Sequence, residues 1–226
     1  MNYEVVIGLE VHVELATNSK LFCSCGAKFG AGPNENVCPA CAGMPGMLPV
    51  ANKKAIELGI AAAIVTNSRI TPTITFDKKN YFYPDLSAGY QITQWFAPIC
   101  RGGYVEIETS EGIKRINLKQ IHIEEDAGKL VHSHGASLVD YNRAGVPLVE
   151  IVSMPDFRGA EEVVAYLEKL RALLSFAGVS DCRMQEGSMR CDVNLSVREA
   201  GTQTLGTRTE MKNMNSLKAI VRAIEY

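Results

Sequence analysis

The chain has 226 residues, enough for one large domain or two small ones with a sizeable core. With 46% hydrophobic and 21% charged residues it has the composition of an ordinary globular protein, and its net charge of −2 excludes nucleic-acid binding through overall charge. The sequence shows no membrane-spanning run and no signal-peptide pattern, so we expect a cytoplasmic protein that makes no use of a membrane.

The first predicted element is a strand over residues 8–15, where apolar and polar residues alternate. Alternation with a period of two places Glu10, His12 and Glu14 on one face of a half-buried strand.

A cysteine cluster follows. Cys23 and Cys25 are separated by twelve residues from Cys38 and Cys41. Two close cysteine pairs joined by a glycine-containing loop are typical of a tetrahedral zinc site, and four sulfur ligands would leave no open position. We therefore predict a structural zinc-binding loop over residues 22–42. The alternative is a loop with four reduced cysteines. The other three cysteines, Cys100, Cys182 and Cys191, lack such spacing, and we expect them in the core.

The next elements are a helix over residues 53–65, capped by Asn52 and carrying isoleucines at four-residue spacing, and a strand over residues 70–76. The segment 77–85 combines basic and aromatic residues, as loops that contact phosphates and bases often do, although ordinary packing explains it equally well. We assign Lys79, Tyr81 and Tyr83 as candidate nucleotide or substrate contacts.

Further strands are predicted around residue 92, over 104–109 and over 113–118, followed by a loop or hairpin over 133–143. Residues 161–176 form the clearest amphipathic helix, which Gly178 ends. A helix begins at residue 216 and stops at residue 226 without a cap, which suggests a piece of a longer protein. This order predicts an α+β fold with a largely antiparallel sheet cradle and a few flanking helices.

Carboxylates recur on the polar positions of four more alternating segments, at residues 121–126, 149–151, 190–195 and 208–212. Carboxylates from separate strands, together with an imidazole, are the ligands that Mg²⁺ binds in proteins. The alternative is that each strand simply has a solvated outer face. The sequence contains no phosphate-binding glycine loop and no serine-nucleophile motif, so any nucleotide phosphates would be held through metal ions, a chemistry suited to phosphoryl transfer.

Several long motifs resemble the B subunits of the bacterial glutamyl/aspartyl-tRNA amidotransferase, the GatB/GatE family. They are residues 4–13 (EVVIGLEVHV), the cysteine set, 79–85 (KNYFYPD), 121–128 (IHIEEDAG), 140–148 (DYNRAGVPL), 190–194 (RCDVN) and 210–216 (EMKNMNS). The likeness covers essentially the whole chain.

The resemblance implies an ATP- and Mg²⁺-dependent carbon–nitrogen ligase that acts on Glu-tRNA(Gln) or Asp-tRNA(Asn). It phosphorylates the side-chain carboxylate and amidates it with ammonia from a partner glutaminase, the A subunit, while a C subunit joins the two. Residues 1–226 would be the catalytic cradle domain, and the family's later helical and tail domains would be absent.

The resemblance also implies the site residues. His12, Glu124 and Glu150 resemble one Mg²⁺ site, and Glu10, Glu125, Asp192 and Glu210 resemble a second. Glu10, His12, Glu125 and Asp192 are the implied catalytic residues, and Arg190 is a further nucleotide or substrate contact. Because adjacent residues of a regular strand face opposite sides, Glu124 and Glu125 would require a bulge or a strand end.

One departure limits the analogy. Much of the family has Leu-Pro-Lys-Gly-Tyr-Gln where this chain has Ser87 and Ala88 in place of the Pro-Lys pair, so no function of that lysine is carried over. Two other classes remain open: a zinc-stabilised nucleic-acid module, which leaves the acidic strands unexplained, and a di-metal phosphohydrolase, which usually employs several histidines.

Overall fold

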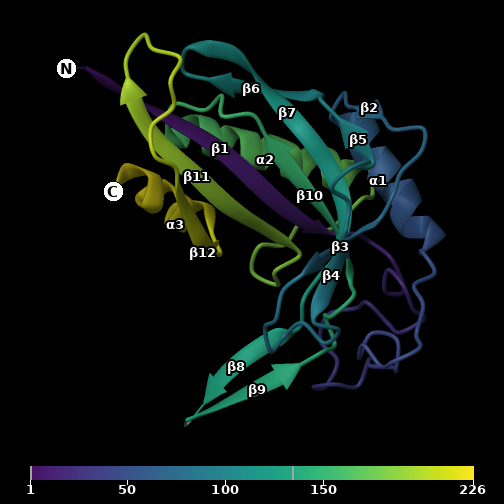
Figure 1. Cartoon of the computed structure of the whole chain (residues 1–226). Helices are drawn as coiled ribbons and strands as arrows, with labels where there is room; N and C mark the ends of the chain where they lie inside the picture. Colours follow the sequence, from purple (N-terminus) through teal and green to yellow (C-terminus); the bar gives the residue numbers. More distant parts are fainter. Residues whose placement is uncertain (1, 134) are drawn as a thin grey trace.

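The structure, a computed structural model, describes residues 2–133 and 135–226. Residue 134, in the predicted 133–143 hairpin region, therefore lies outside the described residues. The fold is α+β with a largely antiparallel sheet, as predicted (Figure 1).

An eight-stranded sheet forms the body of the molecule. Its strands run in the order β12-β11-β1-β10-β7-β5-β2, and β6 pairs with the outer part of β7. The bounds are β1 Tyr3–Glu14, β2 Arg69–Ile70, β5 Cys100–Arg101, β6 Tyr104–Thr109, β7 Gly112–Glu125, β10 Pro147–Ser153, β11 Met189–Glu199 and β12 Thr209–Met214. Every pairing in this sheet is antiparallel, including those that join elements far apart in the sequence.

Two small hairpins extend from the body (Figure 1). One joins β3 Asp77–Asn80 to β4 Tyr90–Thr93, and the other joins β8 Lys129–Ser133 to β9 Ala136–Asp140. The second projects away from the sheet, close to the cysteine loop (Figure 1). Asn34 connects the two, because its backbone N–H and side chain bond Asp140 and Val139 at 3.0 Å.

Three helices occur in the described part of the chain: α1 Lys53–Val65, α2 Ala160–Phe176 and α3 Leu217–Glu225. The predicted caps are present, since the Asn52 side chain accepts a hydrogen bond from the Lys54 N–H and Gly178 follows α2 with a φ of 67°. Ser216 caps α3 in the same manner as Asn52 caps α1.

The alternation of β1 separates the two faces of the sheet. Leu9, Val11 and Val13 are fully buried with the apolar side of α2, whose Leu170 and Tyr166 are also fully buried. The opposite face carries the charged positions of the strands and faces a cavity. The hydrophobic effect thus fixes the register, because a slip of one residue would exchange the two faces.

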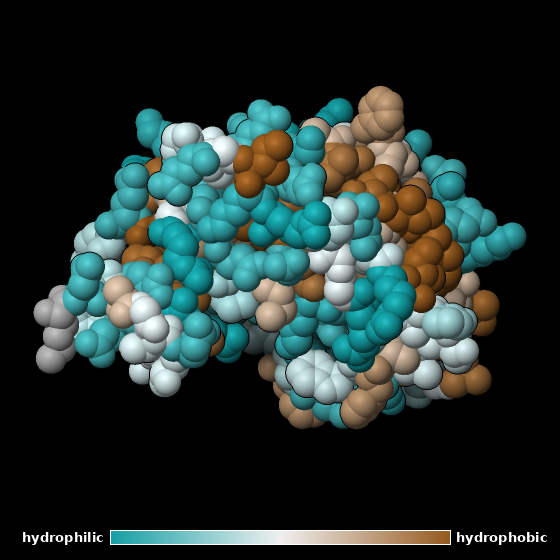
Figure 2. Space-filling view, turned by 90° about the horizontal axis from the view of Figure 1, so that it is seen from above, coloured by the Kyte–Doolittle hydropathy of each residue, from teal (hydrophilic) through white to brown (hydrophobic). Residues whose placement is uncertain are grey.

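Helix α1 does not bury its isoleucines most deeply. The isoleucines at four-residue spacing do not form its buried stripe, and Ile64 is 62% exposed. The buried face is instead made of small residues and one leucine, and Gly59 lies against Ile123, where an added Cβ would come within 2.9 Å of Ile123 Cδ1. Figure 2 shows a continuous hydrophobic area toward the side of the molecule on which α1 lies.

The predicted strand over residues 70–76 is largely wrong, because regular pairing ends at Ile70. Pro72 has no N–H to contribute to a ladder, and only isolated bonds follow, from Thr71 N to Ile99 O and from Thr75 N to Ala97 O. The remaining cysteines, Cys100, Cys182 and Cys191, are buried as expected.

Candidate functional site

The polar face of the sheet borders a cavity of about 860 Å³. Cross-strand pairing brings its residues together: His12 on β1 lies opposite Glu150 on β10 and Arg190 on β11, and Glu150 lies opposite His122 on β7. These four positions form one row across four adjacent strands. A row of this kind cannot be read from any single strand, because it depends on the pairing register.

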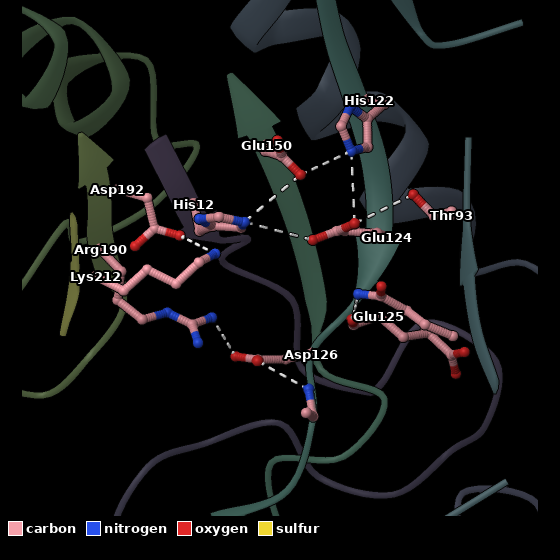
Figure 3. Close-up of polar contacts among 12 residues, drawn as sticks. His12, Thr93, His122, Glu124, Glu125, Asp126, Glu150, Arg190, Asp192 and Lys212 are labelled. Atoms are coloured by element: carbon pink, nitrogen blue, oxygen red, sulfur yellow. Dashed lines mark hydrogen bonds and ion pairs between the residues drawn. The ribbon is translucent and has the colours of Figure 1, made fainter. Parts of the chain in front are cut away.

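The first group of potential metal ligands is His12, Glu124 and Glu150, whose ligand atoms all lie within 4.8 Å of one another. His12 Nε2 is 3.5 Å from Glu150 Oε2 and 3.8 Å from Glu124 Oε1. Figure 3 shows these side chains pointing toward one another. Imidazole nitrogen and carboxylate oxygen are ligands for a divalent cation, so the donor set fits Mg²⁺ or a similar ion.

His122 adjoins the same group, although the sequence alone indicated only His12 as a well-placed histidine. Its Nε2 is 3.0 Å from Glu150 Oε2 and 3.5 Å from Glu124 Oε2. The signal was present in the sequence, because His122 and Glu124 share one face of an alternating strand. Thr93 Oγ1 donates a hydrogen bond to Glu124 at 3.1 Å and fixes the carboxylate from the other side.

The protonation of this group follows from its geometry. Burial opposes a charged His122, but hydrogen bonds to Glu124 and Glu150 raise the pKa of its imidazole to about 9. Glu150 is affected in the opposite direction: burial disfavours its charge, yet the two histidines hold the pKa of its carboxyl well below its usual range. When no cation is bound, the group is thus an ion-paired set of imidazolium and carboxylate groups. Binding of a divalent cation would require His12 to lose its proton.

A second group contains Glu10, Asp192 and Glu210, again with ligand atoms within 4.8 Å of one another. Glu10 lies directly opposite Asp192, a like-charge pair that is destabilising unless a cation balances it. Lys212 Nζ supplies positive charge, 3.0 Å from both Asp192 Oδ2 and Glu210 Oε1. Asn194 donates a hydrogen bond to Glu10 at 3.0 Å.

Glu125 does not join the second group, contrary to our expectation. Strand β7 pairs regularly with β10 as far as its last residue, Glu125, so no bulge turns the two acids to one side, and the strand end, the other expected arrangement, does not do so either. The register shift lies elsewhere, between Val152 and Ser153. Glu124 therefore faces the large cavity, whereas Glu125 faces the opposite side and accepts a hydrogen bond from the Ile92 N–H at 3.2 Å (Figure 3).

The environment of Glu125 is a small cavity of about 60 Å³ behind β7, which Phe22, Cys41 and Ala88 also line. Burial raises the pKa of the Glu125 carboxyl to about 7. Ala88 is the position at which the resemblance leads us to expect a lysine.

Basic residues surround the large cavity. Lys79, Tyr81 and Arg190 line it as candidate contacts, whereas Tyr83 is not among its lining residues and is 58% exposed. Arg190 is held by Asp126, with Nη2 2.6 Å from Oδ2. Lys79 Nζ lies 5.4 Å from the centre of the Tyr81 ring.

Glu14 and Asp126, both among the acids of the alternating segments, form an acidic pair whose proximity those segments did not predict. Burial, and then the charge of Asp126, raise the pKa of the Glu14 carboxyl to about 8. Arg190 and Arg143 adjoin Asp126, and Arg143 also bonds the carbonyl oxygens of residues 127 and 128. These contacts fix the turn after β7 against β11.

The four cysteines of the zinc-binding loop converge. Cys23, Cys25, Cys38 and Cys41 offer sulfur atoms within 4.8 Å of one another, and Cys41 Sγ is 4.0 Å from Cys25 Sγ and 3.9 Å from Cys38 Sγ. Zn–S bonds of about 2.3 Å in a tetrahedron place sulfur atoms about 3.8 Å apart. The donor set thus fits zinc in both chemistry and spacing. A hydrogen bond with Cys23 lowers the pKa of the Cys41 thiol.

Fold and site together define a mainly antiparallel α+β domain with two groups of potential cation ligands, of which all but Glu210 line one cavity, and a four-cysteine loop beside that cavity. None of the helices in the described residues is both long and apolar enough to cross a membrane.

The chain belongs to the GatB/GatE catalytic domain family, whose sequence profile matches residues 5–226. The resemblance drawn from the motifs is thereby confirmed. Its relatives include the B subunits of the aspartyl/glutamyl-tRNA(Asn/Gln) amidotransferases of Lachnoclostridium phytofermentans, 63% identical over 226 residues, and Agathobacter rectalis, 60% identical over 226 residues. The corresponding protein of Caldicellulosiruptor saccharolyticus is 60% identical over 228 residues. These matches cover 99–100% of this chain but only 47–48% of the relatives, so the chain spans about half their length.

Proposed function

We propose that this chain is the catalytic part of the B component of an aspartyl/glutamyl-tRNA amidotransferase, acting in the cytoplasm. In this proposal it uses ATP to phosphorylate the side-chain carboxylate of Glu-tRNA(Gln) or Asp-tRNA(Asn), and ammonia then displaces the phosphate to form the amide. The observation that carries the proposal is that two clusters of potential metal ligands lie at one cavity lined by lysine and arginine. The chain that holds them is about 60% identical to B subunits of such enzymes.

We assign one magnesium site to His12, Glu124 and Glu150, and a second to Glu10, Asp192 and Glu210. Bound cations would neutralise the phosphates of ATP and the attacking carboxylate, whose mutual repulsion otherwise opposes the reaction. The protein's contribution is to hold these ligands rigidly on paired strands, which fixes their separation before substrate arrives.

Positive side chains complete the proposed nucleotide site. Lys79 on β3 and Arg190 on β11 both line the cavity. The Asp126 ion pair restrains Arg190, so that binding a phosphate costs little further side-chain entropy. We withdraw Tyr83 from the proposed contacts because it does not line this cavity.

Glu125 remains a proposed catalytic residue, but in the small cavity rather than as a metal ligand. A carboxyl group that is half protonated near neutral pH suits proton transfer during amide formation. Ammonia would come from a partner glutaminase, the A subunit, with a C subunit joining the two, since this sequence contains no serine–lysine amidase signature.

Phosphorylation measured in the reconstituted complex tests the proposal. Asp192→Asn should abolish acceptor-dependent ADP release with Glu-tRNA(Gln), whereas Glu111→Gln, in the exposed turn between β6 and β7, should leave it unchanged. Wild-type ADP release from the Asp192 variant at limiting Mg²⁺ would refute the assigned site.

The same assay separates the proposal from a di-metal phosphohydrolase, an alternative that His122 favours by adding a second histidine to the group. A hydrolase would release phosphate from ATP at the same rate with and without aminoacylated tRNA. The proposed ligase should do so only when the carboxylate acceptor is present.

A further inference from the structure

Lys20 is a fully buried lysine that neither the proposed reaction nor the metal ligands account for; its exposed fraction is 0%. It lies just before the first cysteine pair, and its backbone N–H donates to the Cys25 carbonyl at 3.0 Å. Its side chain extends to Cys41 Sγ. A buried lysine loses both hydration and side-chain entropy, so its retention requires compensating contacts.

The Lys20 ammonium has three hydrogen-bond acceptors. Nζ lies 2.8 Å from the Asn36 carbonyl, 3.1 Å from the Tyr141 carbonyl and 3.3 Å from Cys41 Sγ. Three acceptors require three N–H donors, which only the protonated amine provides. Among these acceptors, the sulfur alone can carry a full negative charge, as a thiolate.

A zinc ion bound by four thiolates has a net charge of −2, and such a site gains from hydrogen bonds that draw charge from its sulfurs. The contact between Lys20 and Cys41 supplies both a hydrogen bond and a full positive charge. The Lys20 ammonium and the Cys41 thiolate thus offset the cost of burying each other's charge. A neutral Cys41 thiol would not offset the burial of the ammonium.

We propose that Lys20 is an outer-sphere partner of the zinc site, donating a charge-assisted hydrogen bond to the Cys41 thiolate and so strengthening metal binding. This inference rests on the zinc site proposed for the four cysteines. It gives the lysine a purpose that a packing residue of similar volume, such as methionine, would not fulfil.

The same ammonium links the cysteine cluster to the large cavity between the acidic strands. It bonds the Tyr141 carbonyl, two residues before Arg143, which lines that cavity and contacts Asp126. Asn142 adds two further bonds to the cysteine loop, at 2.6 Å to Gly32 O and 2.8 Å from the Asn36 N–H. Loss of zinc should therefore loosen one wall of the cavity as well as the loop.

The test compares Lys20→Met with Lys28→Met, a matched change at an exposed lysine of the same loop, in the full-length protein. Competition with a chromophoric zinc chelator should show about 10–100-fold weaker zinc binding for Lys20→Met, the usual cost of removing such a partner, and no change for Lys28→Met.

Cobalt substitution distinguishes a hydrogen bond to sulfur from a purely structural effect. Removing the bond raises the energy of the sulfur lone pair, so the sulfur-to-cobalt charge-transfer band of Lys20→Met should move to lower energy. The ligand-field bands should keep their positions, because the four sulfur ligands are unchanged. Wild-type zinc affinity together with a wild-type charge-transfer band would overturn the inference.

Wild-type protein provides the remaining controls. Absence of zinc from protein purified without chelator would refute the zinc site itself, a different failure from that of Lys20. If Lys20→Met does not fold, acetic anhydride labelling read by mass spectrometry decides the question. Lys20 should be protected in zinc-loaded protein and labelled after chelation, with Lys28 labelled in both; equal labelling of Lys20 in the two states would exclude its contact with the metallated thiolate.

Discussion

Replacing Glu125 by glutamine should stabilise the chain at alkaline pH. The change keeps an oxygen that accepts the hydrogen bond from the Ile92 N–H but removes the ability to ionise. Because burial raises the pKa of this carboxyl to about 7, folding favours its neutral form. In the wild-type protein, the neutral Glu125 carboxyl therefore makes its full contribution to the free energy of unfolding below pH 4.5. This contribution is lost as the pH rises through 7.

The magnitude follows from the two pKa values. The difference between about 7 in the folded chain and 4.5 in the ordinary group corresponds to about 3 kcal/mol, at about 1.4 kcal/mol per pH unit. Partial exposure of the side chain reduces this figure. We expect Glu125→Gln to raise the free energy of unfolding by about 1–3 kcal/mol at pH 8 and by less than about 1 kcal/mol at pH 5.

Equilibrium denaturation followed by circular dichroism, in EDTA at pH 5 and pH 8, measures the effect. Glu111→Gln provides the control, because its side chain is exposed in a turn. A Glu125 variant that is no more stable than wild type at pH 8 would refute the buried, neutral carboxyl. Weaker Mg²⁺ binding by the same variant would instead show that Glu125 is a ligand of the second metal site, despite its position on the other face of β7.

Other perturbations test the remaining parts of the structure. In EDTA, His122→Gln should destabilise the chain at pH 6, where the imidazolium contributes fully, and this cost should vanish above its folded pKa of about 9 in pH-dependent unfolding. Leu170→Ala, in the buried face of α2, should cost about 2–5 kcal/mol in denaturant titrations, and a smaller cost would mean that this face is loosely packed. Serine at the four zinc-loop cysteines should eliminate bound zinc and lower the melting temperature; unchanged zinc content would exclude the site. The full-length protein alone should release no ammonia from glutamine, and glutaminase activity that survives removal of trace A subunit would contradict the division of labour.

The strands and caps were largely predictable because they depend on local patterns. The alternation in β1 places Glu10 and His12 on one face without any knowledge of the partner strands, and Asn52 caps α1 through a local contact. Rows of residues across several strands could not be predicted in this way. The proximity of His122 to Glu150 depends on the register between β7 and β10, which separate segments of sequence do not specify.

Two features could not be predicted from local patterns. The isoleucine spacing in α1 does not reveal which residues are buried, because Gly59 and the alanines permit closer approach to the sheet and leave Ile64 exposed. The analogy groups Glu125 with Asp192, which requires a bulge or a strand end. Strand β7 has no bulge there and ends at Glu125, whose side chain lies on the other face from that of Glu124, so the structure separates Glu125 from the three acids of the second group.

The unbroken pairing at the end of β7 also bears on how this protein can change during evolution. One amino acid inserted or deleted between Ile121 and Glu125 would transpose two acids between separate chambers, each with its own chemistry. The β8–β9 hairpin begins only four residues after Glu125 and projects from the body. Its base residues Lys129 and Asp140 line the large cavity, so changes of length are tolerated only in its outer part. Length variation among homologous sequences should therefore accumulate in that hairpin, while the inner half of β7 varies by substitution alone.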